Sequence, residues 1–135
     1  MKTVLTIAIM DAPFENSRTV TAFRLIQAAL EAGHDVNVFA YEGAVALSFA
    51  RQAPHANAVH GHDEEQENHP LPRVWIEELL RLASRLGRRL DWVNCGLCVD
   101  ERGVNEAIEG VRRGSPADFW KMSVESGNTL TIGTR

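Results

Sequence analysis

The stretch TVLTIAIM at residues 3–10 decides the fold class. Eight consecutive β-branched or apolar residues are typical of a strand that is buried on both faces, so we expect a central position in a sheet. A polar loop over residues 11–16 follows. Asn16 or Ser17 can then cap a helix whose apolar periodicity ends at Gly33, a residue that favours helix termination.

A second apolar run at residues 36–41 predicts the next strand, and residues 42–52 predict a helix of small residues. The chain thus opens with a strand, a helix, a strand and a helix. This alternation favours a parallel sheet with helices packed against it. We therefore expect a single α/β domain over residues 1–135 with a mostly parallel, five-stranded sheet.

The rest of the chain continues the alternation after an interruption. Residues 53–72 contain three prolines, four histidines and an acidic run, a composition that predicts a mobile loop. Further elements are expected as an amphipathic helix at 75–87, a strand at 90–94, a helix at 99–111, a short strand at 118–122 and a final strand at 130–132.

Composition limits the class of partner. The 135 residues are 44% hydrophobic and 24% charged, with a formal net charge of -4, whereas nucleic-acid binders usually carry a basic excess. The N-terminal apolar run is too short to span a membrane. We expect neither nucleic acid nor membrane as a partner. The two cysteines are too close in sequence to cross-brace a fold, which points to reduced thiols in the cytoplasm.

Those two cysteines form the segment Cys95-Gly96-Leu97-Cys98, between a predicted strand and a predicted helix. A thiolate at such a junction is stabilised by the first N–H groups of the helix and by its dipole. Arg102 would add to this stabilisation, whereas Asp100 and Glu101 would oppose it. The pattern predicts a reactive sulfur at Cys95. Cys98 is a second thiol that could attack a Cys95 persulfide and release sulfide, or pass the sulfur onward.

Two groups of residues resemble a known family. The first runs from Ala22-Phe23 through Gly33-His34 to Glu42-Gly43, and the second is Cys95 followed by Arg102-Gly103-Val104. Both are similar to segments of the DsrE/TusD-like (DsrE/DsrF) sulfur-relay proteins, in which a cysteine ends a strand and an arginine-glycine pair follows in the next helix. Cys95 takes the position of the sulfur-accepting cysteine. Where better-known members have small apolar residues after that cysteine, this chain has Gly96-Leu97-Cys98.

The resemblance implies a three-layer α/β/α fold and a sulfurtransferase or sulfur-carrier activity through a persulfide on Cys95. Arg102 becomes a candidate stabiliser of its thiolate. The resemblance further implies no cofactor, sulfur donor and acceptor proteins as partners, and assembly into homotrimers or hexamers.

Other interpretations of the cysteines stay open. Free cysteine is among the most buried residue types, so Cys95 and Cys98 could simply pack in a non-catalytic, oligomeric interaction protein of the same fold. A C-x-x-C motif before a helix also occurs in thioredoxin-like redox proteins, although there it follows an early strand. Solvent accessibility of Cys95 distinguishes a carrier from a packed cysteine, because a carrier must present its sulfur to a partner.

A zinc site is a weaker alternative. Zinc favours sets of four thiolate and imidazole ligands. The two cysteines could combine with histidines of the loop, but the spacing is unlike that of a zinc finger; the histidines concerned are His55, His60, His62 and His69. We expect no bound metal. No glycine-rich loop joins a strand to a helix start, so we also expect no nucleotide cofactor.

Several polar residues follow the first two strands and could line a site at their carboxyl ends. Each of these residues also has a purely structural interpretation. Asn16 is a helix cap, Asp11 a turn former, Tyr41 a packed aromatic ring and Glu42 a solvated acid in a first helical turn. We favour these structural roles. We expect the three tryptophans to be core or subunit-contact residues, namely Trp75, Trp92 and Trp120.

Overall fold

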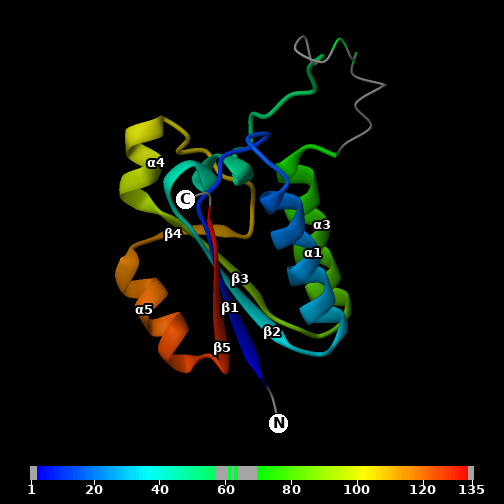
Figure 1. The fold of residues 1–135 in the computed structure, drawn as a ribbon, viewed down its shortest axis with the longest axis vertical. Helices are drawn as coiled ribbons and strands as arrows, with labels where there is room; N and C mark the ends of the chain where they lie inside the picture. Colours follow the sequence, from blue (N-terminus) through cyan, green and yellow to red (C-terminus); the bar gives the residue numbers. More distant parts are fainter. Residues whose placement is uncertain (1–2, 57–60, 62, 64–69, 134–135) are drawn as a thin grey trace.

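The computed structural model of the chain describes residues 3–56, 61, 63 and 70–133. Its strands are β1 (Val4–Ile9), β2 (Asp35–Ala40), β3 (Leu90–Cys95), β4 (Val111–Gly114) and β5 (Asn128–Ile132). All neighbouring pairs are parallel, and the order across the sheet is β4-β3-β2-β1-β5 (Figure 1). The expected parallel five-stranded sheet is confirmed, with β1 next to its centre.

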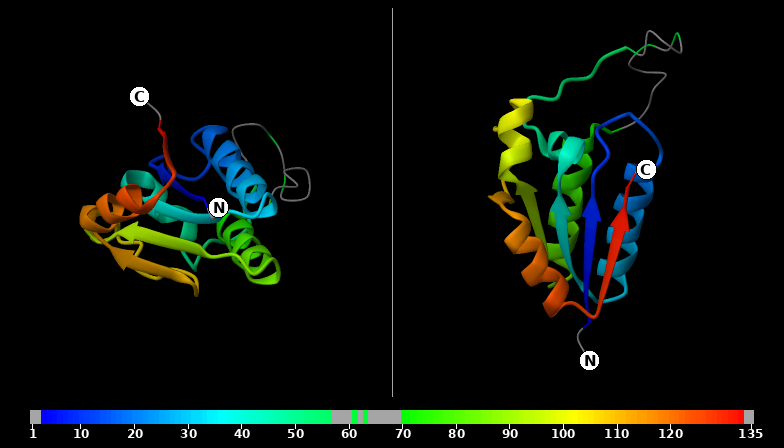
Figure 2. Two further views of the ribbon diagram at one scale, coloured as in Figure 1. Left: turned by 90° about the horizontal axis from the view of Figure 1, so that it is seen from below. Right: turned by 60° about the vertical axis from the view of Figure 1, so that its left-hand side comes forward.

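Helices cover both faces of the sheet, which gives the expected three layers. α1 (Arg18–Glu31) and α3 (Pro72–Arg85) lie on one face, and α5 (Pro116–Glu125) lies on the other (Figures 1 and 2). The short elements η1 (Glu42–Ser48) and α4 (Gly96–Arg102) lie at the carboxyl ends of the strands (Figure 2). Among the described residues, no helix is long and apolar enough to cross a membrane.

Strand alternation divides the core into two parts. The larger part fills the space between the sheet and the helices α1 and α3, and includes Trp92 and Phe23. The smaller part lies on the opposite face, towards α5, and includes Phe39, Cys95 and Met122. Side chains of β3 thus serve two different layers, with Trp92 on one side and Cys95 on the other.

The prediction of a helix at residues 99–111 is wrong. α4 begins at Gly96 and ends after seven residues, because Gly103 adopts the left-handed conformation (φ 66°) that closes a helix. The chain then crosses to the edge of the sheet, where Val111 begins β4 instead of ending a helix. Pairing with β3 overrides the helical pattern of this segment, because β3 offers an unpaired edge.

The prediction of a strand at residues 118–122 is also wrong, since this segment lies in α5. Ser115 is its N-cap: the side chain accepts a hydrogen bond from the N–H of Ala117, and Asp118 accepts one from the N–H of Ser115. Together with Pro116 in the first turn, this is a helix-start signal.

The helix of small residues expected at 42–52 is shorter and of a different type. η1 is a 3₁₀-helix that ends at Ser48, and Phe49 leaves it to form an antiparallel bridge with Ala107. Most of the loop predicted to be mobile, at residues 53–72, lies outside the described residues. The other expected strands and helices are confirmed to within a few residues.

The cap of α5 makes stability depend on pH. The hydrogen bond from the N–H of Ser115, assisted by Arg112, holds the pKa of Asp118 below its usual value. A carboxylate with a lowered pKa adds stability above its unfolded-state pKa and loses it as the pH falls through the folded-state value. We expect Asp118→Ala to cost about 0.5 kcal/mol near neutral pH and little in acid. Urea unfolding near pH 7 and below about pH 3 checks this, and equal losses at both would contradict it.

Candidate functional site

Cys95 is the last residue of β3, at the carboxyl end of the sheet. Its side chain faces the α5 layer and packs in the smaller part of the core with Phe39, Val93 and Val99. The residue is only 7% exposed. The strand end therefore places this sulfur as predicted, but beneath other side chains and not on the open surface.

Cys98 lies three residues further on, in α4, and is half-buried. Its sulfur accepts a hydrogen bond from the backbone N–H of Glu42 (3.2 Å), and its side chain packs against the buried cluster that contains Cys95. Burial raises the pKa of the Cys98 thiol and the neighbouring Cys95 raises it further, while the Glu42 N–H acts in the opposite direction. Cys98 therefore holds its proton.

Glu42 is held in an unusual backbone conformation, with a positive φ of 50° that L-residues rarely adopt. The next residue, Gly43, packs against the loop after β1 so closely that an added Cβ would lie 2.7 Å from the Cβ of Ala12. At the other end of η1, Ser48 accepts a hydrogen bond from Asn94 of β3 (2.8 Å). These contacts fix η1 on the sheet and direct the Glu42 N–H to Cys98.

Arg113 of β4 is the functional candidate that sequence reasoning missed. β4 pairs with β3 so that Arg113 lies opposite Asn94, and its side chain crosses over Gly96, where an added Cβ would lie 2.6 Å from Nε. Both terminal nitrogens bind the carboxylate of Asp100, at 2.8 and 2.6 Å. That ion pair is the main reason why the pKa of Arg113 is raised. Arg113 thus places a guanidinium over Gly96, the residue that follows Cys95.

Comparison with known proteins identifies this arrangement of elements. Residues 3–132 match the DsrE/DsrF-like family. The chain belongs to this family. It is 30% identical over 129 residues to the uncharacterized protein MJ0989 of Methanocaldococcus jannaschii, which covers 94% of this chain and 97% of that protein. The likeness to the uncharacterized protein MK0008 of Methanopyrus kandleri is also 30% over 129 residues, and covers 94% of this chain and 92% of that one.

A solved structure has a similar fold. The crystal structure of the ychN protein from E. coli superposes with a TM-score of 0.66 at 20% identity, and covers 97% of this chain and 99% of that one. The resemblance expected from the sequence is therefore confirmed at the level of the family and of the fold.

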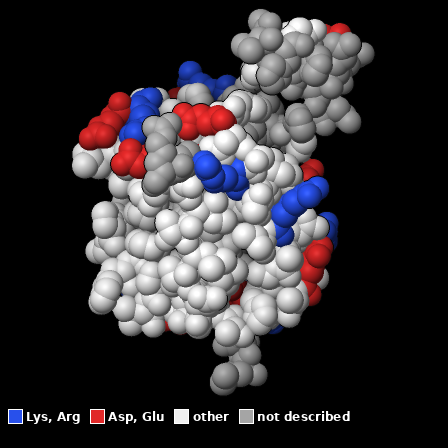
Figure 3. Space-filling model, viewed as in Figure 1, with Lys and Arg blue, Asp and Glu red and all other residues white. Residues whose placement is uncertain are grey.

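Arg102 was predicted to stabilise a thiolate in this DsrE/DsrF-like chain. Its guanidinium instead binds the Glu42 carboxylate (2.9 Å) and, at 3.4 Å, the carbonyl oxygen of Cys98. Arg102 therefore ties α4 to the start of η1 and supports the position of the Glu42 N–H. In Figure 3, acidic and basic side chains lie next to one another over α4.

The other polar candidates mostly have the structural roles that we favoured. Asn16 accepts a hydrogen bond from the N–H of Arg18 at the start of α1 (2.7 Å), and Tyr41 stacks on Phe39. Asp11 is buried, and its carboxylate lies 3.8 Å from the guanidinium of Arg18. Glu42 is the expected solvated acid in a first helical turn, and in addition its backbone N–H binds Cys98 and its carboxylate binds Arg102.

The metal alternative depends on residues that are only partly described. His55 lies edge-on against Phe14, whereas His60, His62 and His69 lie outside the described residues. Within the described ranges, no three side chains of histidine, cysteine, aspartate or glutamate converge on a point that could hold a metal ion.

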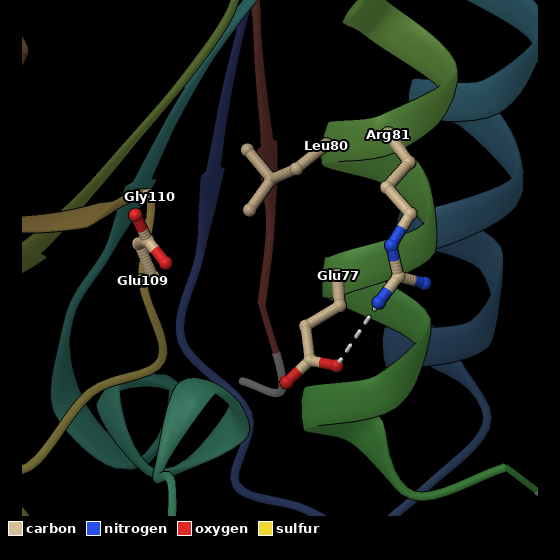
Figure 4. A pocket seen from close by; sticks show the side chains of 5 residues that line it. All are labelled: Glu77, Leu80, Arg81, Glu109 and Gly110. Atoms are coloured by element: carbon tan, nitrogen blue, oxygen red, sulfur yellow. Dashed lines mark ion pairs between the residues drawn. The ribbon is translucent and has the colours of Figure 1, made fainter.

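A pocket of about 360 Å³ lies away from the cysteines, between α3 and the turn before β4 (Figure 4). Glu77, Arg81, Leu80 and the turn Glu109-Gly110 line it, and Arg81 pairs with Glu77 at 3.7 Å. The pocket contains no nucleophile. We therefore assign it no part in sulfur chemistry.

Proposed function

We propose that this DsrE/DsrF-like protein carries sulfane sulfur as a persulfide on Cys95 and passes it to a protein thiol. The observation that supports the proposal best is the arrangement at the end of β3. Cys98 lies in the first turn of α4, three residues after Cys95, and the guanidinium of Arg113 lies over Gly96 between them. An adjacent cation and a Cys-x-x-Cys segment are features of sites with reactive cysteines.

Two exchange steps describe the proposed cycle. The Cys95 thiolate attacks the outer sulfur of a persulfide or polysulfide donor. A new S–S bond forms, the S–S bond of the donor breaks, and the donor leaves as a thiolate with the electron pair. An acceptor thiolate then attacks the outer sulfur of the Cys95 persulfide in the same way. Neither step requires a metal or an organic cofactor.

The exposure of Cys95 favours a second candidate function. At 7% exposure, its sulfur is poorly accessible to a donor protein in this conformation. A packed cysteine of this kind is expected in a non-catalytic, oligomeric interaction protein of the same fold. In a carrier, by contrast, a donor reaches Cys95 only when side chains packed around its sulfur move.

Sulfur loading decides between the two candidates. The reduced protein is incubated with inorganic polysulfide, desalted, and analysed by intact mass and by peptide mapping after thiol blocking. A carrier gains one sulfur atom on the peptide that contains Cys95. An unchanged mass with polysulfide and with thiosulfate would favour the interaction protein.

Arg113→Met tests the cation beside the site. Removal of this guanidinium leaves Asp100 unpaired near Cys95, so we expect polysulfide to load Cys95 severalfold more slowly. Arg112→Met is the matched control, since Arg112 is the adjacent residue of β4 but pairs with Asp91 and Asp118. Stopped-flow or quenched mass analysis measures both rates. Equal rates for the two variants would remove Arg113 from the proposal.

We further propose that the chain forms a homo-oligomer, a trimer or hexamer, through the layer of α5 and β5. Figure 3 shows this face with few charged side chains. Trp120 and Val124 lie one turn apart on α5 and are 72% and 64% exposed. Large exposed rings that are flanked by uncharged surface are typical of subunit contacts.

Trp120→Glu tests this contact. A buried charge at a central aromatic position costs about 2 kcal/mol, so we expect subunit affinity to fall about thirtyfold. Sedimentation velocity over a range of concentrations measures the change in mass. Leu25→Glu is the control, because Leu25 is also partly exposed but lies on α1 in the opposite layer. A wild-type mass equal to that of a monomer would contradict the proposal.

A further inference from the structure

The two thiols of the C-x-x-C segment lie together at the start of α4. Cys95 caps α4 and Cys98 lies in its first turn, and side chains three residues apart in a helical turn are neighbours. Both thiols are free, and Cys98 packs against the buried cluster that contains Cys95. Cys98 is therefore the closest sulfur nucleophile to any sulfur atom bound to Cys95.

We propose that Cys98 resolves the Cys95 persulfide, so that the protein reduces sulfane sulfur and releases it as hydrosulfide. This inference rests on the proposed persulfide on Cys95. It adds a second activity, since the sulfur leaves as a small anion in addition to being passed to a protein thiol. The substrates would be hydropersulfides and polysulfides, whose outer sulfur is at the sulfane oxidation level.

The resolving step balances without an external reagent. The Cys98 sulfur attacks the inner sulfur of the persulfide, which is the Sγ atom of Cys95 at the start of the same helix. A Cys95–Cys98 bond forms and the bond to the outer sulfur breaks. The proton of Cys98 leaves with the outer sulfur as hydrosulfide. The two cysteines are oxidised to a disulfide while the sulfane sulfur is reduced by two electrons, and a dithiol reductant must then restore the thiols.

The surroundings of Cys98 support a role beyond packing. Its sulfur accepts the Glu42 N–H at 3.2 Å, from a residue with a positive φ that Gly43 and Arg102 hold in place. This donor stabilises negative charge on Cys98 as the thiol loses its proton during attack. Burial raises the pKa of Cys98, so its thiol stays protonated while the sulfur donor reacts. Cys95 is therefore the residue that attacks the donor first.

The test follows the loaded protein after the donor has been removed. Wild type, Cys98→Ser and Cys95→Ser are reduced, treated with inorganic polysulfide and desalted, and hydrosulfide is then measured against time together with intact mass. We expect wild type to release about one hydrosulfide per chain and to end as an internal disulfide. Cys98→Ser should keep its extra sulfur at least tenfold longer and release little hydrosulfide.

The outcomes separate this inference from the proposed function. A wild-type persulfide that persists as long as that of Cys98→Ser, without an internal disulfide, would overturn the resolving role and leave the carrier intact. Absence of sulfur gain in both proteins would overturn both. A serine at position 98 can still hydrogen-bond the Glu42 N–H, and urea unfolding of Cys98→Ser verifies that the chain is folded. A second addition of polysulfide after treatment with a dithiol should restore hydrosulfide release in wild type.

Discussion

Cys95→Ser should gain no sulfur from polysulfide under conditions in which Cys98→Ser is loaded and wild type is loaded before its persulfide is resolved. A hydroxyl is not deprotonated near neutral pH and is a poor nucleophile towards sulfur, so the loss should be complete within the sensitivity of intact-mass analysis. The measurement compares the three proteins after identical incubation and desalting. Serine is close to cysteine in size, so the packing with Phe39 and Val93 should be largely kept.

Cys98→Ser is the matched control, because it removes the neighbouring sulfur and keeps Cys95. Loading of Cys95→Ser at the wild-type level would assign the sulfur to Cys98, the more exposed of the two residues. Loss of loading in both variants would mean that the two sulfurs act only as a pair. Near-ultraviolet circular dichroism shows whether each variant keeps its tertiary packing.

Trp92→Ala should cost about 3–5 kcal/mol of unfolding free energy, the largest stability effect that we expect in this chain. Trp92 is fully buried between the sheet and the layer of α1 and α3, where its ring contacts that of Phe23. Alanine leaves a cavity that neighbouring strands cannot close. Total stabilities of domains are about 5–15 kcal/mol, so part of the population should unfold at physiological temperature.

Urea unfolding measures this cost, with Trp92→Phe as the control. Phenylalanine keeps much of the apolar volume and removes an indole N–H that has no hydrogen-bond partner among the described residues, so it should cost far less than alanine. Because Trp92 and Cys95 lie on opposite faces of β3, the folded fraction of Trp92→Ala should still load sulfur. An unchanged urea midpoint would show that the packing of Trp92 against α1 and α3 contributes less to the unfolding free energy than its burial implies.

Long apolar runs and periodic helices allowed most of the fold to be predicted from the sequence. β1 and α3 each carry a signal over many residues that no neighbouring element opposes. The region after Cys98 has no such signal. α4 is only two turns long, and β4 is a four-residue edge strand whose existence depends on pairing with β3.

The part of the site that lies at the end of a predicted strand could be predicted from the sequence. Cys95 could be placed at the end of a strand because the apolar run before it is clear. The Glu42 N–H, which binds Cys98, and the Arg113 side chain, which lies over Gly96, could not be placed, because both come from elements distant in sequence. Arg102, which is close to Cys98 in sequence, binds Glu42 instead. Proximity along the chain was therefore a poor guide to the charges around the sulfurs.

The position of β4 at the edge of the sheet has a consequence for how the protein behaves in concentrated solution. An edge strand offers unpaired backbone groups to any other extended chain, and charged side chains along it are a common protection against aggregation. Two of the four residues of β4 are exposed arginines, Arg112 and Arg113. Redesign of the sulfur site by removal of both arginines would leave an uncharged edge open to intermolecular sheet growth. Colloidal solubility therefore limits how far the reactivity of this site can be altered.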